Sequence, residues 1–150
     1  MRAETLLMIA ARAEHIDRVI LPAIKRGAIV LCDRFKDSST VYQGIANDIP
    51  IREIDKIHAF ALKTCEPDLT ILLDIPAEIG IKRALDRNEN NQRFERKGEF
   101  FHKKIRDGYL KIASSYPDRI KIIDGSQTIE KISDEIFQLV SPILKSGLSK

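Results

Sequence analysis

The sequence lacks the features that would place it outside ordinary globular proteins. Its 150 residues include only 7 Gly and 6 Pro, and 43% are hydrophobic, which argues against a disordered chain. No apolar run approaches the roughly 18 residues of a membrane span, and no signal-peptide pattern opens the chain. A phosphate loop of the form Gly-x-x-x-x-Gly-Lys-Ser/Thr does not occur either. We therefore expect one globular domain over residues 1–150, located in the cytoplasm and independent of membranes.

The sequence has too few cysteines to indicate a disulfide framework and too few histidines to indicate a metal centre. Its net positive charge is too small to indicate a nucleic-acid surface. Cys32 and Cys65 lie far apart, and Cys32 ends a segment predicted to be a buried strand, so both are predicted to be reduced thiols. His15, His58 and His102 share no metal-binding spacing and are interpreted as surface or packing residues. A net charge of +3 argues against non-specific nucleic-acid binding but suits an anionic small substrate.

Short apolar runs alternate with helical periodicities along the chain. The runs at about 28–32, 69–73 and 120–123 predict three strands, and the second is apolar on both faces, as in a parallel sheet covered by helices on both sides. The predicted helices are a long one ending near Gly27 with a bend at Pro22, a short one from Ser38 or Ser39, one after Pro50, one over about 77–87, one from about Phe101 to Tyr116, and one from about Ile129 to Ile143. This alternation is typical of βαβ units and predicts an α/β fold.

An acid and an arginine follow the first predicted strand. The carboxyl ends of parallel strands usually face the ligand crevice of an α/β sheet, so Asp33 and Arg34 are candidates for chemistry. The planar guanidinium of Arg34 could hold a phosphate, and Asp33 could reach a hydrated magnesium ion. Taken alone, the pair could equally be a salt bridge or a cap at the end of a strand.

Two pairs of side chains at four-residue spacing could bind a flat base. Ser39 and Gln43 would share one helix face and offer hydrogen bonds to the polar edge of a heterocycle. Met8 and Arg12 repeat the spacing in the first helix, with a thioether to lie against a ring and a guanidinium to bond its carbonyl oxygens. Each pair alone could be ordinary packing, but together with Arg34 they predict a site for a nucleoside monophosphate.

These motifs, in this order, resemble the thymidylate kinase family, phosphate-loop enzymes that phosphorylate dTMP with ATP. Asp-Arg-aromatic followed by Ser-Ser and Tyr-Gln-Gly is specific to this family among nucleoside monophosphate kinases. The matching segments are residues 10–12, 31–35, 37–44, 67–74, 92–95, 101–102 and 108–110. The resemblance implies a three-layer P-loop kinase-like fold, with a parallel sheet and helices on both faces, whose N-terminal strands are missing from these residues. It also implies a homodimer formed through helices that include the first one.

The resemblance assigns the acceptor side of the site. By it, Arg12, Ser39 and Gln43 would bind thymine, and Met8 would cover the ring where the family usually has an aromatic side chain. Arg34 would hold the phosphate of dTMP. The implied substrates are dTMP and ATP, and the implied metal is Mg²⁺.

The resemblance also places residues on the ATP side. Asp33 would lie near the magnesium ion. A lid at about 87–98 would bring Arg87 and Arg93 onto the transferring phosphates. Without the resemblance, the polar segment that contains Arg93 would be interpreted as a solvated, flexible loop.

The missing phosphate loop leads to two further expectations. Met1 falls where the family has already passed its first strand and its phosphate loop, whose amides and lysine hold ATP, so the 150 residues are expected to be inactive alone. The missing strand would lie between 28–32 and 69–73, so the isolated chain is expected to be unstable, to dimerise over the gap or to rearrange.

Two alternatives to a thymidylate kinase stay open. One is another nucleoside monophosphate kinase whose base pocket is changed at Met8. The other is a non-catalytic remnant that acts only as a dimerisation module.

Overall fold

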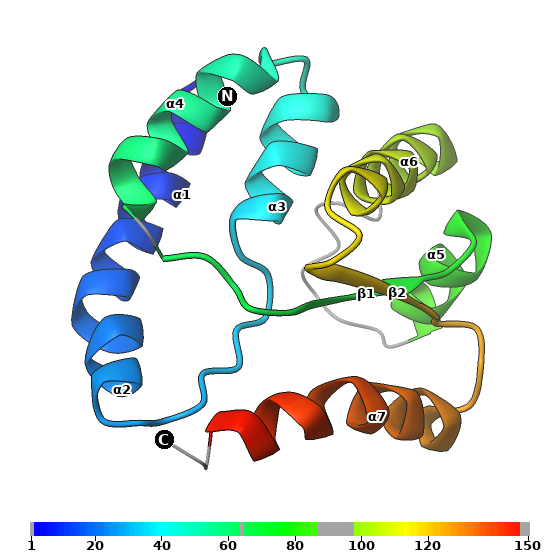
Figure 1. The fold of residues 1–150 in the computed structure, drawn as a ribbon. Helices are drawn as coiled ribbons and strands as arrows, with labels where there is room; N and C mark the ends of the chain where they lie inside the picture. Colours follow the sequence, from blue (N-terminus) through cyan, green and yellow to red (C-terminus); the bar gives the residue numbers. More distant parts are fainter. Residues whose placement is uncertain (1, 64, 87–97, 148–150) are drawn as a thin grey trace. The chain divides into compact units, whose positions relative to one another are not determined.

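The chain folds as two compact units in a computed structural model that describes residues 2–63, 65–86 and 98–147. The units are Met1–Pro67, which is helical, and Asp68–Lys150, which combines strands and helices (Figure 1). No helix within the described ranges is both long and apolar enough to cross a membrane. The expectation of a single domain over residues 1–150 stays a prediction.

A long helical segment opens the first unit. Helix α1 (Arg2–His15), the π-helical turn η1 (Ile16–Ile20) and helix α2 (Leu21–Lys25) follow one another without a break (Figure 1). Pro22 lies in the first turn of α2. A proline inside a helix lacks an amide hydrogen and crowds the carbonyl four residues earlier, and the wider π turn directly before it relieves both constraints. The bend predicted at Pro22 stays a prediction, and the structure places the π-helical turn η1 directly before α2.

Gly27 ends this helical segment. Its φ of 76° lies in the left-handed region, which glycine adopts without a steric cost. The Gly27 amide donates to the Ile24 carbonyl at 2.9 Å, and the Ala28 amide donates to the Ala23 carbonyl at 3.1 Å. This pair of bonds satisfies carbonyls that a helix end otherwise leaves unpaired. The predicted helix end near Gly27 is confirmed.

The predicted strand at 28–32 is wrong. No strand is assigned to these residues, and Ile29 and Leu31 are 68% and 91% exposed. The predicted burial of Cys32 is wrong for the same reason, because its side chain is exposed, although both cysteines are free thiols as expected. A strand needs the amides and carbonyls of a neighbour, and no segment in the described part of the chain pairs with 28–32.

Three helical elements complete the first unit. Helix α3 (Lys36–Ser39) continues into the π-helical turn η2 (Thr40–Ile45), and helix α4 (Ile51–Leu62) follows Pro50, as predicted. The short helix begins at Lys36 rather than at Ser38 or Ser39. Helix α4 packs against α1 and η2 through one buried face, which carries Ile54, His58 and Leu62.

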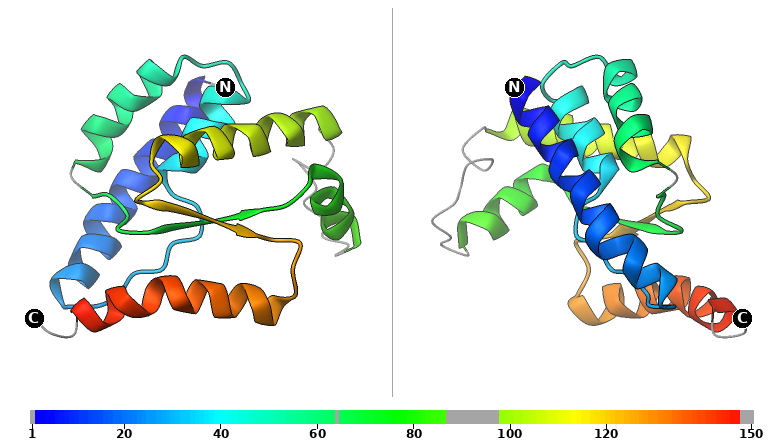
Figure 2. Two further views of the ribbon diagram at one scale, coloured as in Figure 1. Left: turned by 45° about the vertical axis from the view of Figure 1, so that its right-hand side comes forward. Right: turned by 90° about the vertical axis from the view of Figure 1, so that its left-hand side faces the viewer.

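The second unit contains the sheet. Strands β1 (Thr70–Asp74) and β2 (Ile120–Asp124) pair in parallel, with Thr70 opposite Ile120 and Asp74 opposite Asp124. The helices of this unit are α5 (Ala77–Asp86), α6 (Glu99–Ser115) and α7 (Ile129–Gly147). Helix α6 lies on one side of the strand pair and α7 on the other (Figure 2). The α/β interpretation and the predicted strands at 69–73 and 120–123 are confirmed within one residue.

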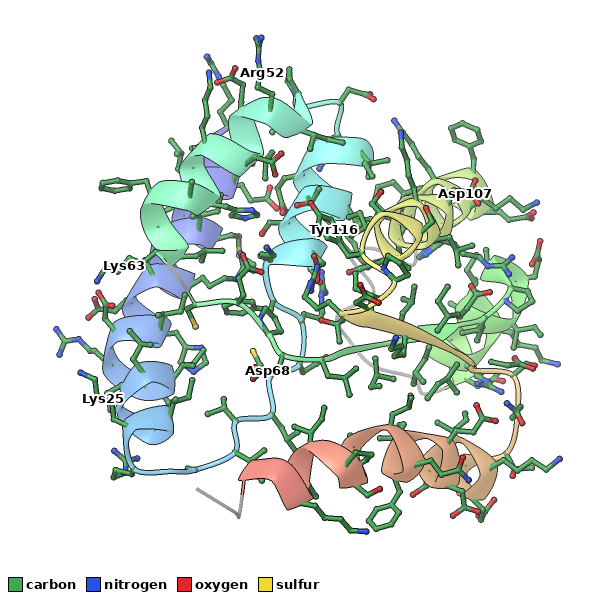
Figure 3. The ribbon with its side chains drawn as sticks, viewed as in Figure 1. Lys25, Arg52, Lys63, Asp68, Asp107 and Tyr116 are labelled. Carbon is green, nitrogen blue, oxygen red and sulfur yellow. The ribbon has the colours of Figure 1, made fainter. Side chains whose placement is uncertain are left out.

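The predicted apolar faces of α6 and α7 are only partly buried. Ile105 and Ile112 of α6 are buried, but Tyr116 is the C-cap residue of the helix and is 55% exposed (Figure 3). On α7, Ile129 and Ile143 are exposed. The exposed members of these faces lie toward the ends of their helices: Tyr116, Ile129 and Ile143. At these ends the apolar pattern of the sequence continues beyond the part of the helix that is buried.

An arginine fork closes the carboxyl end of β1. Arg106 on α6 donates from Nε to Asp74 Oδ1 at 2.6 Å and from Nη2 to Asp74 Oδ2 at 2.8 Å. This paired geometry is the strongest form of a carboxylate–guanidinium contact. The hydrogen bond from Arg106 is the main cause that holds the pKa of Asp74 below its usual value. The contact fixes α6 against the strand pair.

We expect Ile54→Ala to lower the free energy of unfolding by about 2–5 kcal/mol, because the Ile54 side chain is 0% exposed between α4 and its neighbours. Ile51 offers a matched control on the same helix, since it is 39% exposed, and Ile51→Ala should cost less than about 1 kcal/mol. Urea denaturation would measure both. Equal losses in the two variants would contradict the packing of α4.

We expect the Asp74–Arg106 contact to stabilise the protein at neutral pH and to fail in acid. Because the pKa of Asp74 is lowered in the folded state, its contribution is present above the ordinary value of 3.8 and is lost as the pH falls through the lowered value. Asp74→Asn should therefore lower the thermal midpoint by a few degrees at pH 7, and the gap to the unsubstituted protein should shrink toward pH 3. Asp118→Asn, at an exposed position, is the control; a gap for Asp74→Asn that does not change with pH would contradict the ion pair.

Candidate functional site

The turn that holds Arg34 is set by an unusual backbone conformation. Arg34 has a φ of 65°, which is uncommon for a residue other than glycine and is often associated with functional turns. Its guanidinium carbon lies 4.4 Å from the ring centroid of Tyr42, within the range of a cation–π contact. Its Nε donates to Ser38 Oγ at 3.4 Å. The exposed Arg34 side chain is thus guided by α3 and η2 while it remains open to a ligand.

A hydrogen bond joins α1 to α3. Arg12 Nη1 donates to Ser39 Oγ at 2.8 Å, and the two residues are 27 apart in sequence. Ser39 is 2% exposed and Arg12 is half-buried. The guanidinium carbon of Arg12 also lies 5.6 Å from the ring centroid of Phe35. The structure therefore brings together two of the predicted base-binding residues, from different helices.

The other two predicted base-binding residues lie on α1 and on η2, the turn that continues α3. Gln43 belongs to η2 and is 8% exposed, and Met8 lies one helical turn before Arg12 and is 48% exposed. A buried amide and a half-exposed thioether combine hydrogen-bonding capacity with a soft apolar surface. We call these four residues of the first unit, Met8, Arg12, Ser39 and Gln43, the acceptor cluster.

Asp33 could bind a metal ion only together with a bound substrate that supplies further oxygen ligands. Its carboxylate is exposed beside Arg34, and the described residues contain no group of three or more His, Cys, Asp or Glu side chains that could hold an ion. Mg²⁺ commonly keeps several waters and takes one or two carboxylates together with substrate phosphates. One exposed carboxylate next to an exposed arginine fits that kind of site and does not fit an all-protein metal cage.

Two buried polar residues beside the acceptor cluster escaped the sequence analysis. Asp37 on α3 is 9% exposed, and His58 on α4 is 6% exposed. The Nε2 atom of His58 has no hydrogen-bond partner in the described part of the chain. Burial lowers the pKa of His58, and the nearby charge of Arg12 lowers it further. The four-residue spacing of His58 from the buried Ile54 and Leu62 could have revealed its burial.

The remaining predicted residues lie outside this region of the structure. Arg87 and Arg93, the predicted lid arginines, fall outside the described residues, so their roles stay predictions. The second unit has a groove between α6, β2 and α7, whose lining includes Ile120, Ile123 and Leu139 and no predicted site residue.

Comparison with known proteins identifies relatives of the chain in one family. The family model described as thymidylate kinase matches residues 1–136. The chain is 39% identical over 157 residues to a thymidylate kinase of Geobacter sp. (strain M21), with 99% of this chain and 70% of the relative covered. It is 45% identical over 136 residues to the thymidylate kinase of Clostridium novyi (strain NT), with coverages of 90% and 66%. It is 46% identical over 137 residues to that of Caulobacter vibrioides, with coverages of 91% and 65%.

These matches span most of this chain and about two thirds of each relative. A family model that covers nine tenths of the chain, with identities near 40%, agrees with the motifs and with the α/β architecture of the second unit. The chain belongs to the thymidylate kinase family of nucleoside monophosphate kinases, phosphotransferases with the P-loop kinase fold.

Proposed function

We propose that the first unit is the acceptor side of a thymidylate kinase, which phosphorylates dTMP to dTDP with ATP. The observation that carries the proposal is the acceptor cluster, in which Arg12 on α1 is bonded to Ser39 on α3 and Gln43 is buried on η2. A guanidinium, a hydroxyl and an amide together supply donors and acceptors that match the carbonyl and imide edge of thymine. Met8 supplies an apolar surface for the face of the ring.

The charged residues have separate parts in the proposed reaction. Arg34 holds the phosphate of dTMP, because it is an exposed fixed cation positioned by Tyr42 and Ser38. Asp33 would contribute one carboxylate to Mg²⁺, whose charge would offset that of the phosphates when ATP is bound. Arg87 and Arg93 belong to the lid in this proposal and stabilise the charge of the transition state.

Phosphoryl transfer depends mainly on positioning and electrostatic stabilisation, so the acceptor cluster acts by holding dTMP in place. The 150 residues contain no phosphate-loop pattern, and such a loop supplies the amides and the lysine that hold ATP. We therefore propose that these residues alone bind dTMP without transferring phosphate. A cytoplasmic location and a homodimer formed through a surface that includes α1 are further parts of the proposal.

Binding of dTMP to the 150-residue chain tests the acceptor cluster directly. We expect isothermal titration to show binding, and Arg12→Ala to weaken it by about 10- to 100-fold, because a hydrogen bond from a charged group contributes about 1.5–3 kcal/mol. Arg18 is a matched control in the same helical segment, with an exposed side chain paired to Glu14, and Arg18→Ala should bind normally.

The same titration separates the alternatives. Tighter binding of dUMP, dCMP or AMP than of dTMP would indicate a nucleoside monophosphate kinase with another preference. A folded protein that dimerises and binds none of them would favour the dimerisation module and contradict the proposed function.

Arg34 should act on the phosphate and not on the base. Arg34→Met keeps an apolar side chain over Tyr42 and removes the charge, so we expect dTMP to bind about 10-fold more weakly and thymidine to bind as it does to the unsubstituted protein. Calorimetry with both ligands would measure this. An equal loss for thymidine would show that Arg34 shapes the base pocket instead.

A further inference from the structure

His58 lies where the helices of the acceptor cluster meet. It occupies the buried face of α4, which packs against α1 and η2, and its side chain is 6% exposed. Its Nε2 atom has no hydrogen-bond partner among the described residues. No described residue therefore holds the imidazole ring by a hydrogen bond at Nε2. The protonation state of the ring determines whether this buried position carries a positive charge.

Charged groups act on this imidazole from several elements. Arg12 comes from α1, Lys36 and Asp37 come from α3, and Asp55 comes from α4 itself, whereas η2 carries no charged side chain. Burial and then the Arg12 charge lower the pKa of His58, with a smaller effect of Lys36 in the same direction, while the two carboxylates oppose them. The ring is therefore neutral at neutral pH.

Protonation of His58 would place a second cation near Arg12 in a largely desolvated region. Repulsion between like charges is strong where water is scarce. Ser39 is 2% exposed and is held in its helix, whereas Arg12 is half-buried and has a route to solvent. Arg12 therefore has more freedom to move than Ser39, and a movement of its guanidinium away from His58 would break the 2.8 Å contact to Ser39 Oγ.

We propose that His58 is a positioning residue for Arg12, whose neutral ring allows Arg12 to stay bonded to Ser39 and whose protonated ring drives Arg12 away, so that acid weakens binding of the nucleotide base. The effect on the nucleotide rests on the proposed function. The coupling between His58, Arg12 and Ser39 does not.

The first experiment therefore uses the protein without nucleotide. Nitrogen-15 NMR of the Arg12 Nε–H group is followed from pH 8 to pH 5 in the unsubstituted chain, in His58→Asn and in His15→Asn, an exposed histidine on the same helix as Arg12. We expect the Arg12 signal to shift below pH 6.5 in the unsubstituted chain and in His15→Asn, and to stay constant in His58→Asn. A signal that is constant in all three, or that shifts equally in His58→Asn, would overturn the inference.

The inference can still be tested if His58→Asn fails to fold. The ring signals of His58 in the unsubstituted chain give its own titration midpoint, and the midpoint of the Arg12 signal must coincide with it. Different midpoints would overturn the inference without any substitution.

Thymidine then serves as the ligand, since it lacks the phosphate whose own ionisation near pH 6 would complicate the result. A group with the ordinary pKa of 6.5 would weaken binding by about 30-fold at pH 5. Because the pKa of His58 is lowered, we expect a smaller loss of thymidine affinity at pH 5, and no such loss in His58→Asn. Absence of thymidine binding together with a titrating Arg12 signal would contradict the proposed function alone. Thymidine binding with the same pH dependence in His58→Asn would overturn the inference alone.

Discussion

A buried polar group must find its partner within the protein, and this requirement determines most of the structure. It pairs β1 with β2 in register over their whole length, so that each strand supplies the other's amides and carbonyls. It closes the long helical segment at Gly27 with two backbone bonds. It also holds α6 to the sheet, because Arg106 satisfies both oxygens of Asp74. The exposed 28–32 run shows the converse, since a segment without a strand partner keeps its backbone in contact with water.

The acceptor cluster uses the same requirement to build a binding surface. Ser39 is almost fully buried, so its hydroxyl needs a partner, and Arg12 supplies one from another helix. The arginine is thereby tied to α3, and aromatic rings lie near both Arg12 and Arg34. Hydroxyl groups and aromatic faces contact both cations, and neutral partners of this kind do not cancel the charge of an arginine.

His58 is an exception to the pairing of buried polar atoms. Its Nε2 atom is buried without a partner in the described part of the chain, and such an atom has an energetic cost of about 1–3 kcal/mol. Strain of this kind is often found near functional sites, where a residue is kept for what it does to its neighbours. The π-helical turns η1 and η2 are also rare features that are frequently found at functional sites, and Gln43 belongs to η2.

The sequence by itself determined the α/β class, the helices on either side of the sheet strands and the parallel strands near 69–73 and 120–123, and it predicted the residues of the acceptor cluster. These follow from local signals: apolar runs for strands, periodicity for helices, and short motifs whose side chains lie on one helix face. The motif resemblance was also sufficient to identify the family, which the comparisons then confirmed.

Only the tertiary structure decided which groups meet. The bond between Arg12 and Ser39 joins residues 27 apart, and no local spacing indicates it. The failure of 28–32 to form a strand has the same origin, because apolar composition favours a strand but a ladder needs a neighbouring backbone. The burial of Asp37 likewise depends on which helix faces pack together. Local sequence determines which secondary structures a segment can form. Long-range pairing of its polar groups determines which of them it forms in the folded protein.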